Sequence, residues 1–136
     1  MNNRYLIEAS SLRKTFDAKG GGVFKHFKKS NLKVYAVDDV TFKLEPKEII
    51  GLIGESGCGK TTTAKILLKL LNVDEGELLY KGQDITHLKN RELTEYRKKT
   101  QIVFQDPYEF LNPRMNILNI VTEPLLINKL LNSENE

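Results

Sequence analysis

Residues 54–61, GESGCGKT, have the residue types and the spacing needed to hold a chain of phosphates. Three glycines permit positive φ angles, so the backbone can curl closely around an anion. The N–H groups of such a curl attract phosphate, as does the positive end of a helix beginning near Lys60. Lys60 would reach the β- and γ-phosphates, and the Thr61 hydroxyl would bind Mg²⁺. The segment therefore predicts a nucleoside-triphosphate site.

The sequence on both sides of this loop supports that interpretation over an incidental glycine-rich turn. Residues 49–54, IIGLIG, predict a short strand buried on both faces, and residues 60–71 predict a helix. Cys58, inside the loop, is either a reactive thiolate at a helix N-terminus or a small side chain that fills space, and we favour the second. The residues predicted to contact the nucleotide are Gly54, Glu55, Ser56, Gly57, Cys58, Gly59, Lys60, Thr61 and Thr62.

Two strands are predicted before the loop, over residues 5–16 and 34–44. The second alternates, with Val40 and Phe42 on one face, as a half-buried strand does. A glycine- and lysine-rich stretch separates the two strands. Its residues 23–33 form either a basic-aromatic patch for nucleic acid or lipid or a solvated loop, and we favour the loop because charged loops usually are that.

Four further elements are predicted after the first helix. The first is a short strand between two turns in residues 72–85, NVDEGELLYKGQDI. Residues 90–99 predict a helix capped by Asn90, and residues 100–105, TQIVFQ, predict a second buried strand. Residues 113–131 place apolar side chains at helical spacing, interrupted by Pro124. The pattern as a whole indicates an antiparallel flap against an α/β core.

Composition limits the function classes that need to be considered. A chain of 136 residues with 40% hydrophobic and 29% charged residues can bury one ordinary core, which excludes a disordered chain. A net charge of +3 is too small to argue for nucleic acid, and one cysteine excludes an internal disulfide. No apolar segment approaches the roughly 20 residues of a membrane span, and the start lacks a signal peptide. We therefore expect a cytoplasmic location and, at most, peripheral contact with a membrane.

The phosphate loop alone does not choose among GTPases, kinases and transport ATPases. A guanine reader of the form N-K-x-D is missing, because the only Asn-Lys pair, at 128–129, is followed by two leucines. Residues 103–115, VFQDPYEFLNPRM, are more specific. Together with GESGCGK (54–60) and VYAVDDVTFKL (34–44), they resemble the ATP-binding subunits of ABC transporters of the oligopeptide/dipeptide/nickel importer branch. Residues 109–110, Glu-Phe, depart from the two small residues usual in that branch.

The resemblance implies a fold, domain boundaries and ligands. The expected fold is an α/β core of the P-loop NTPase type with an N-terminal antiparallel β subdomain. Residues 1–136 would be the N-terminal part of an ABC-type nucleotide-binding domain, with a loop insertion at about 18–33 and the start of a helical subdomain at about 113–136. The implied ligands are ATP and Mg²⁺.

The resemblance also implies further site residues and partners. Gln105 would be the Q-loop glutamine, contacting Mg²⁺ or the attacking water and acting with Lys60 in catalysis; alternatively it is a polar residue at the end of a strand. Phe16 would stack on adenine or be a core aromatic, and Tyr35 is another candidate for the stacking role. Transmembrane permease subunits would contact residues 105–111, a second ATP-binding subunit would complete the site, and no nucleic acid is expected. The location would be the inner face of the cell membrane.

The later motifs of the family are not found in these 136 residues. We find no L-S-G-G-Q-like signature, no apolar run ending in Asp-Glu and no switch histidine. A positioned general base is typically worth about 10² to 10⁴ in rate, so ATP binding with little hydrolysis is expected. The sequence is interpreted as a truncated product or a partial record, with unpaired strand edges and an uncovered helix at 114–131.

Two other functions stay open at this point. One is a non-catalytic nucleotide-binding module that docks on a partner through its exposed helix and basic loop. The other is a soluble ABC-type ATPase acting on nucleic acid, which would need more basic charge. The importer subunit is favoured because of residues 105–114, and oligopeptide, dipeptide and nickel all remain possible substrates.

Overall fold

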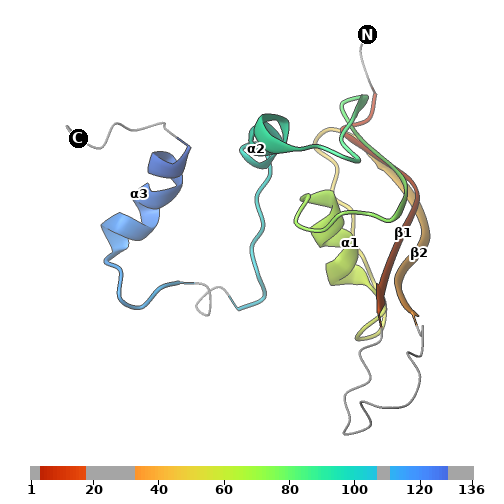
Figure 1. Ribbon diagram of the computed structural model, residues 1–136, viewed down its shortest axis with the longest axis horizontal. Helices are drawn as coiled ribbons and strands as arrows, with labels where there is room; N and C mark the ends of the chain where they lie inside the picture. Colours follow the sequence, from red (N-terminus) through yellow and green to blue (C-terminus); the bar gives the residue numbers. More distant parts are fainter. Residues whose placement is uncertain (1–3, 18–32, 107–110, 129–136) are drawn as a thin grey trace, which may run out of the picture. The chain divides into compact units, whose positions relative to one another are not determined.

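The computed structural model describes residues 4–17, 33–106 and 111–128 (Figure 1). The chain divides into two compact units, Met1–Thr94 and Glu95–Glu136, and each is described by itself. The elements of the first unit are β1 (Ile7–Asp17), β2 (Lys33–Leu44), α1 (Lys60–Leu67), β3 (Glu75–Tyr80) and β4 (Gln83–Asp84). Helix α2 (Asn90–Arg97) spans the boundary, and α3 (Ile117–Ile127) belongs to the second unit.

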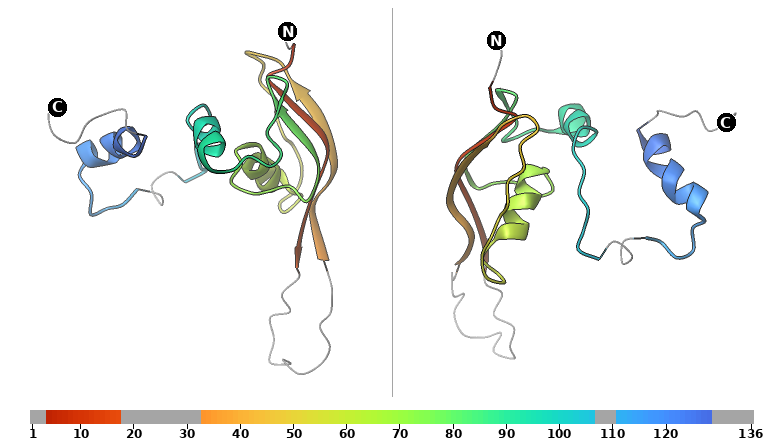
Figure 2. Two further views of the ribbon diagram at one scale, coloured as in Figure 1. Left: turned by 45° about the horizontal axis from the view of Figure 1, so that its top comes forward. Right: turned by 180° about the vertical axis from the view of Figure 1, so that it is seen from behind.

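The four strands form one antiparallel sheet in the order β2-β1-β3-β4 (Figure 2). The long β1–β2 pair runs from Ile7 opposite Leu44 to Phe16 opposite Val34. Both predicted strands are confirmed, and the alternation predicted for β2 holds, since Val40, Phe42 and Leu44 are half-buried while Thr41 and Lys43 are exposed. The sheet is the antiparallel β part that the sequence predicts.

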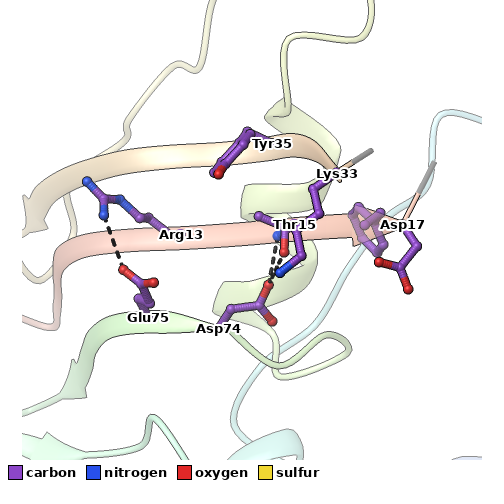
Figure 3. A pocket seen from close by; sticks show the side chains of 8 residues that line it. Arg13, Thr15, Asp17, Lys33, Tyr35, Asp74 and Glu75 are labelled. Carbon is purple, nitrogen blue, oxygen red and sulfur yellow. Dashed lines mark hydrogen bonds and ion pairs between the residues drawn. The ribbon is translucent and has the colours of Figure 1, made fainter. Parts of the chain in front are cut away.

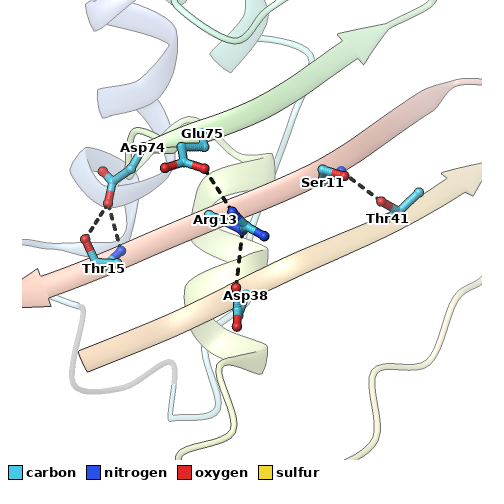
Figure 4. Close-up of polar contacts among 7 residues, drawn as sticks. All are labelled: Ser11, Arg13, Thr15, Asp38, Thr41, Asp74 and Glu75. Atoms are coloured by element: carbon cyan, nitrogen blue, oxygen red, sulfur yellow. Dashed lines mark hydrogen bonds and ion pairs between the residues drawn. The ribbon is translucent and has the colours of Figure 1, made fainter. Parts of the chain in front are cut away.

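A bulge in β1 lies opposite a glycine of β3. Ser11 has a φ of 49° and its N–H donates to Thr41 Oγ1 over 2.8 Å (Figure 4). Gly76 on the neighbouring strand has a φ of 95°, and a Cβ there would lie 2.4 Å from the Ser11 carbonyl oxygen. Only glycine fits this position, and a bulge of this kind bends the strand and increases its twist.

The core of the first unit lies between the sheet and α1, which contacts β2 (Figure 2). Its fully buried side chains come from three elements: Leu12 of β1, Ile66 of α1 and Leu78 of β3. The register shifts between Leu12 and Thr15 place extra residues in β2, so β1 itself alternates regularly there. Lys14 and Phe16 therefore share the face of Leu12.

Helix α1 ends four residues earlier than predicted, at Leu67 rather than residue 71. Lys69 adopts a left-handed φ of 54°, and the N–H of Leu70 returns to the Lys65 carbonyl over 2.8 Å, closing the helix with a Schellman motif. Lys69 is also buried, with 3% of its surface exposed, and its Nζ donates to the Thr86 carbonyl over 2.6 Å. This contact joins the end of α1 to the segment after β4.

The prediction of two buried strands, at residues 49–54 and 100–105, is wrong. Residues 49–53 and 101–104 are not strands, and Ile49, Ile53 and Val103 are 95%, 97% and 86% exposed. A strand needs a neighbour that accepts its N–H groups and donates to its carbonyls. Within the described residues, strand pairing is confined to the sheet of β1 to β4, and neither apolar run belongs to that sheet.

Helix α3 continues through Pro124, so the predicted interruption is wrong. It begins after Asn116, whose side chain accepts from the Asn119 N–H over 2.8 Å, and at its end the Asn128 N–H reaches the Pro124 carbonyl. No residue of α3 is buried, as expected for the uncovered apolar helix. None of the described helices is long and apolar enough to cross a membrane.

We predict that Leu12→Ala destabilises the first unit strongly, because Leu12 is fully buried where the sheet meets α1. Removing a buried leucine side chain typically lowers the free energy of unfolding by about 2–5 kcal/mol. Urea titration followed by circular dichroism measures the change. The control is Leu52→Ala, at a leucine that is 44% exposed, and an equal loss in both variants would contradict the assigned core.

Candidate functional site

The loop at residues 54–61 leads from an exposed segment into α1, which begins at Lys60 as predicted. Residues 51–58 are exposed, and Gly59 immediately before the helix is left-handed with a φ of 96°. The Gly59 carbonyl starts the helix by accepting from the Thr63 N–H over 2.8 Å and from the Thr63 hydroxyl over 3.1 Å. The curled loop therefore lies at the positive end of helix α1.

Gly59 also sets how closely the loop approaches the sheet. A Cβ at this position would lie 2.1 Å from the Ala36 carbonyl oxygen and 3.9 Å from Val37 Cγ2. Real Cβ atoms do not come this close to a backbone oxygen, and the φ of Gly59 is unfavourable for any side chain. Glycine here lets the start of α1 rest directly on the backbone of β2.

The Lys60 ammonium lies across the loop and is hydrogen-bonded to two of its carbonyl groups. Nζ donates to the carbonyls of Gly54 over 2.8 Å and Glu55 over 2.7 Å. A third, weaker contact joins Nζ to Cys58 Sγ at 3.4 Å. The predicted loop residues are thus brought together around one positive charge, with Cys58 exposed beside it.

Several N–H groups and hydroxyls at the loop have no hydrogen-bond partner among the described residues. The first N–H groups of a helix have no intrahelical acceptor, and those of Lys60, Thr61 and Thr62 donate to no described residue. The Thr61 hydroxyl has no hydrogen-bond partner among the described residues either. This set fits an anion held by N–H groups, with a hydroxyl oxygen available as one ligand for a hard cation.

A cavity of about 170 Å³ lies between this loop and the start of β2. Its lining residues are Val34, Tyr35, Ala36, Gly57, Gly59, Lys60, Thr61 and Thr62. A second cavity of about 590 Å³ borders the same end of the sheet, with Phe16 among its lining residues. Figure 3 shows Tyr35 and Asp74 at this cavity. Tyr35 of β2 is the residue that lines both cavities.

The structure separates the two interpretations of Phe16. Its side chain is 41% exposed, so it is not a core aromatic. Phe16 pairs with Val34, and side chains directly opposite each other in a sheet share a face. Phe16 therefore lies on the same face as Val34, which lines the loop cavity, whereas Tyr35 pairs with Thr15.

The remaining predicted residues belong to the second unit or lie outside the described residues. Gln105 is exposed and belongs to the second unit, so its role beside the loop stays a prediction. Leu111 is 44% exposed, whereas the predicted permease contact at 107–110 and the predicted insertion at 18–32 lie outside the described residues.

Sequence reasoning missed Asp74, which binds the end of β1. Its carboxylate accepts from Lys14 Nζ over 2.5 Å. It also accepts from the Thr15 N–H over 2.7 Å and from the Thr15 hydroxyl over 3.0 Å, as Figure 4 shows. The pKa of Asp74 lies below its ordinary value of 3.8, chiefly because Lys14 donates to the carboxylate, and Thr15 adds to this while burial opposes it. The contact spans about 60 residues, so no local pattern signals it.

Comparisons with known proteins match nearly the whole chain. A family model described as ABC transporter covers residues 37–134. The oligopeptide transport ATP-binding protein OppF of Streptococcus mutans is 41% identical over 133 residues, which is 98% of this chain and 40% of that protein. OppF of Haemophilus influenzae is 42% identical over 126 residues, which is 93% of this chain and 37% of that protein. The chain spans about two fifths of the length of these curated relatives.

Solved structures give the same result for the fold. The dimeric structure of MJ0796, a bacterial ABC transporter cassette, matches with a TM-score of 0.70 and 26% identity, over 96% of this chain and 50% of that one. The same cassette in a post-hydrolysis state bound to ADP and Pi matches with a TM-score of 0.69 and 26% identity, over 89% and 47% of the two chains.

We predict that Gly59→Ala abolishes binding of a triphosphate by the loop, because the added Cβ would collide with the Ala36 carbonyl. The matched control is Gly51→Ala, where a Cβ would meet no atom within 4 Å. Calorimetric titration with inorganic tripolyphosphate measures both variants. Equal affinities for the two variants would show that the close approach does not shape the site.

We predict a pH-dependent contribution of Asp74 to stability, measured as the difference in free energy of unfolding between the wild type and Asp74→Asn. Because folding lowers the pKa of Asp74, this contribution is full above the ordinary value of 3.8 and is lost as the pH falls through the lower folded pKa. Since the pair is partly exposed, about 0.2–1 kcal/mol is expected at pH 7.

Urea titrations between pH 7 and pH 2.5 give this difference. The control is Glu77→Gln, at a β3 carboxylate without a hydrogen bond or ion pair among the described residues. A difference that increases toward low pH for Asp74→Asn would contradict the assignment.

Proposed function

We propose that this chain, which belongs to the ABC transporter family, is the N-terminal part of the ATP-binding subunit of a peptide importer. The observation that carries the proposal is the loop at 54–61, with Lys60 across it at the start of α1. The match of residues 37–134 to the family model supports ATP as the ligand. ADP and Pi in a structural neighbour support it further.

The loop would hold the phosphates without rearranging its backbone. The open N–H groups of Lys60, Thr61 and Thr62 would donate to phosphate oxygens at the positive end of α1. Lys60 already donates to two carbonyls, so its weak contact with Cys58 Sγ is the one that a β- or γ-phosphate oxygen would replace. Glu55, Ser56 and Gly57 would shape the loop around the ligand.

Mg²⁺ would neutralise phosphate charge when bound, and the chain offers it few ligands of its own. Among the described residues, no three His, Cys, Asp or Glu side chains are grouped so that they could hold a metal ion. From the loop motif and the family resemblance, the proposed protein ligands are the Thr61 hydroxyl and the Gln105 carboxamide, with ligand phosphates and water completing the set.

The base would reach the end of the β1–β2 pair. Phe16 offers an exposed ring on the same face as Val34, and Val34 lines the loop cavity. We assign adenine stacking to Phe16 on this ground, and Tyr35, which lines the loop cavity itself, is the alternative stacking residue. Stacking on an aromatic ring tolerates different bases, so this contact supplies affinity more than discrimination.

The assembly is proposed from the relatives. Membership of an importer would place the chain on the inner face of the cell membrane, with permease subunits near residues 105–111 and a second ATP-binding subunit. Residues 18–33 would be an insertion, and residues 113–136 would begin a helical subdomain. Oligopeptides are the favoured cargo because two of the relatives described above are named for oligopeptide transport.

Lys60→Ala tests the proposal. Loss of a charge-assisted hydrogen bond to phosphate is expected to weaken ATP binding about ten- to a hundredfold, measured by calorimetric titration of the 136-residue chain in Mg²⁺ buffer. The matched control is Lys65→Ala, five residues further along α1, which should bind as the wild type does. Unchanged affinity in Lys60→Ala would overturn the assigned site.

A further inference from the structure

We infer that Asp74 and Lys14 form a positioning pair for Phe16, holding its ring where the nucleotide base stacks. This inference rests on the proposed function, because it takes Phe16 as the stacking residue. Asp74 and Lys14 touch no phosphate in this assignment. They would act through the aromatic ring.

Asp74 takes the place of a strand partner for Thr15 at the edge of the sheet. Strand β3 begins at Glu75, opposite Arg13, so β1 continues beyond the end of its neighbour. The N–H of Thr15 would lack a strand partner there, and the Asp74 carboxylate accepts it over 2.7 Å (Figure 4). In return, the Asp74 N–H donates to the Arg13 carbonyl over 2.9 Å. Asp74 thus fixes the backbone immediately before Phe16.

The Phe16 ring lies beside the Lys14 ammonium. Asp74 holds the Lys14 ammonium at 2.5 Å, and that ammonium lies 5.7 Å from the centroid of the Phe16 ring. Lys14 and Phe16 are two residues apart on a regular strand, so both are on the face of the sheet that carries the core. A cation held over a ring is attracted by its negative face, which favours one ring orientation.

Lys14 is less exposed than the Phe16 ring that it contacts. The Lys14 side chain is 16% exposed, whereas Phe16 is 41% exposed. A partly exposed phenylalanine at the end of a strand pair is free to change rotamer unless a neighbour holds it. Lys14 is that neighbour, and Asp74 keeps Lys14 in place. Without the pair, ATP binding would have to order the ring, and the ordering would weaken affinity.

The experiment compares two ligands that share the phosphate chain but differ in the base. Affinities of the full 136-residue chain for ATP and for inorganic tripolyphosphate are measured by calorimetric titration in Mg²⁺ buffer. Asp74→Asn is expected to lower affinity for ATP about threefold and to leave affinity for tripolyphosphate unchanged. Phe16→Ala should lower affinity for ATP about tenfold, again with tripolyphosphate unchanged.

The chain contains a matched control at the other end of the sheet. Glu8 pairs with Lys43 at 3.1 Å, and the Lys43 ammonium lies 4.6 Å from the centroid of the Tyr5 ring. Glu8→Gln therefore breaks the same kind of carboxylate, lysine and aromatic arrangement away from the loop. It should change neither affinity.

A second pair of variants covers the case in which Asp74→Asn folds poorly. Lys14→Arg keeps a cation for Asp74 and for the ring and should bind ATP as the wild type does, whereas Lys14→Met should lose about threefold. Unchanged ATP affinity in Asp74→Asn and Lys14→Met, or an equal loss for both ligands, would overturn the inference. Unchanged ATP affinity in Phe16→Ala would instead overturn the assignment of the stacking residue, while Lys60→Ala tests the phosphate loop separately.

Discussion

The approach of Gly59 to the carbonyl of Ala36 is the constraint on which the rest of the site depends. A loop that merely preceded a helix could adopt many positions relative to the sheet. Here the absence of a side chain lets the start of α1 rest on the backbone of β2, and the left-handed turn at the same residue directs the chain into the helix. The phosphate loop, the start of β2 and Phe16 therefore lie within one compact unit, and Gly59 sets the distance between the loop and the sheet.

The loop is also electrostatically prepared before any ligand binds. Lys60 is held by two carbonyls, so its charge is located in the curl rather than spread over the rotamers of a free lysine. The restriction of that side chain is thus already met, which would lower the entropy that phosphate binding has to remove. Under the proposed function, a phosphate chain would meet a preformed set of donors and would replace only the weak contact between Lys60 Nζ and Cys58 Sγ.

The sequence predicted what is encoded locally and missed what depends on distant neighbours. The loop motif, the start of α1 and the two long strands follow from glycine positions and alternation, and the comparisons confirm the predicted family and its fold. IIGLIG and TQIVFQ have the composition of buried strands, yet composition cannot supply the partner strands that their backbones require. Asp74 was missed for the same reason, since only the register of β1 against β3 brings it to Lys14.

The buried Lys69 has a consequence for how the first unit assembles. An ammonium loses favourable hydration when it is buried, and here the Thr86 carbonyl compensates at the end of the β3–β4 hairpin. The C-terminal end of α1 and that hairpin therefore stabilise each other through this contact. Because the same helix begins at the phosphate loop, the loop and the far edge of the sheet become parts of a single cooperative folding unit.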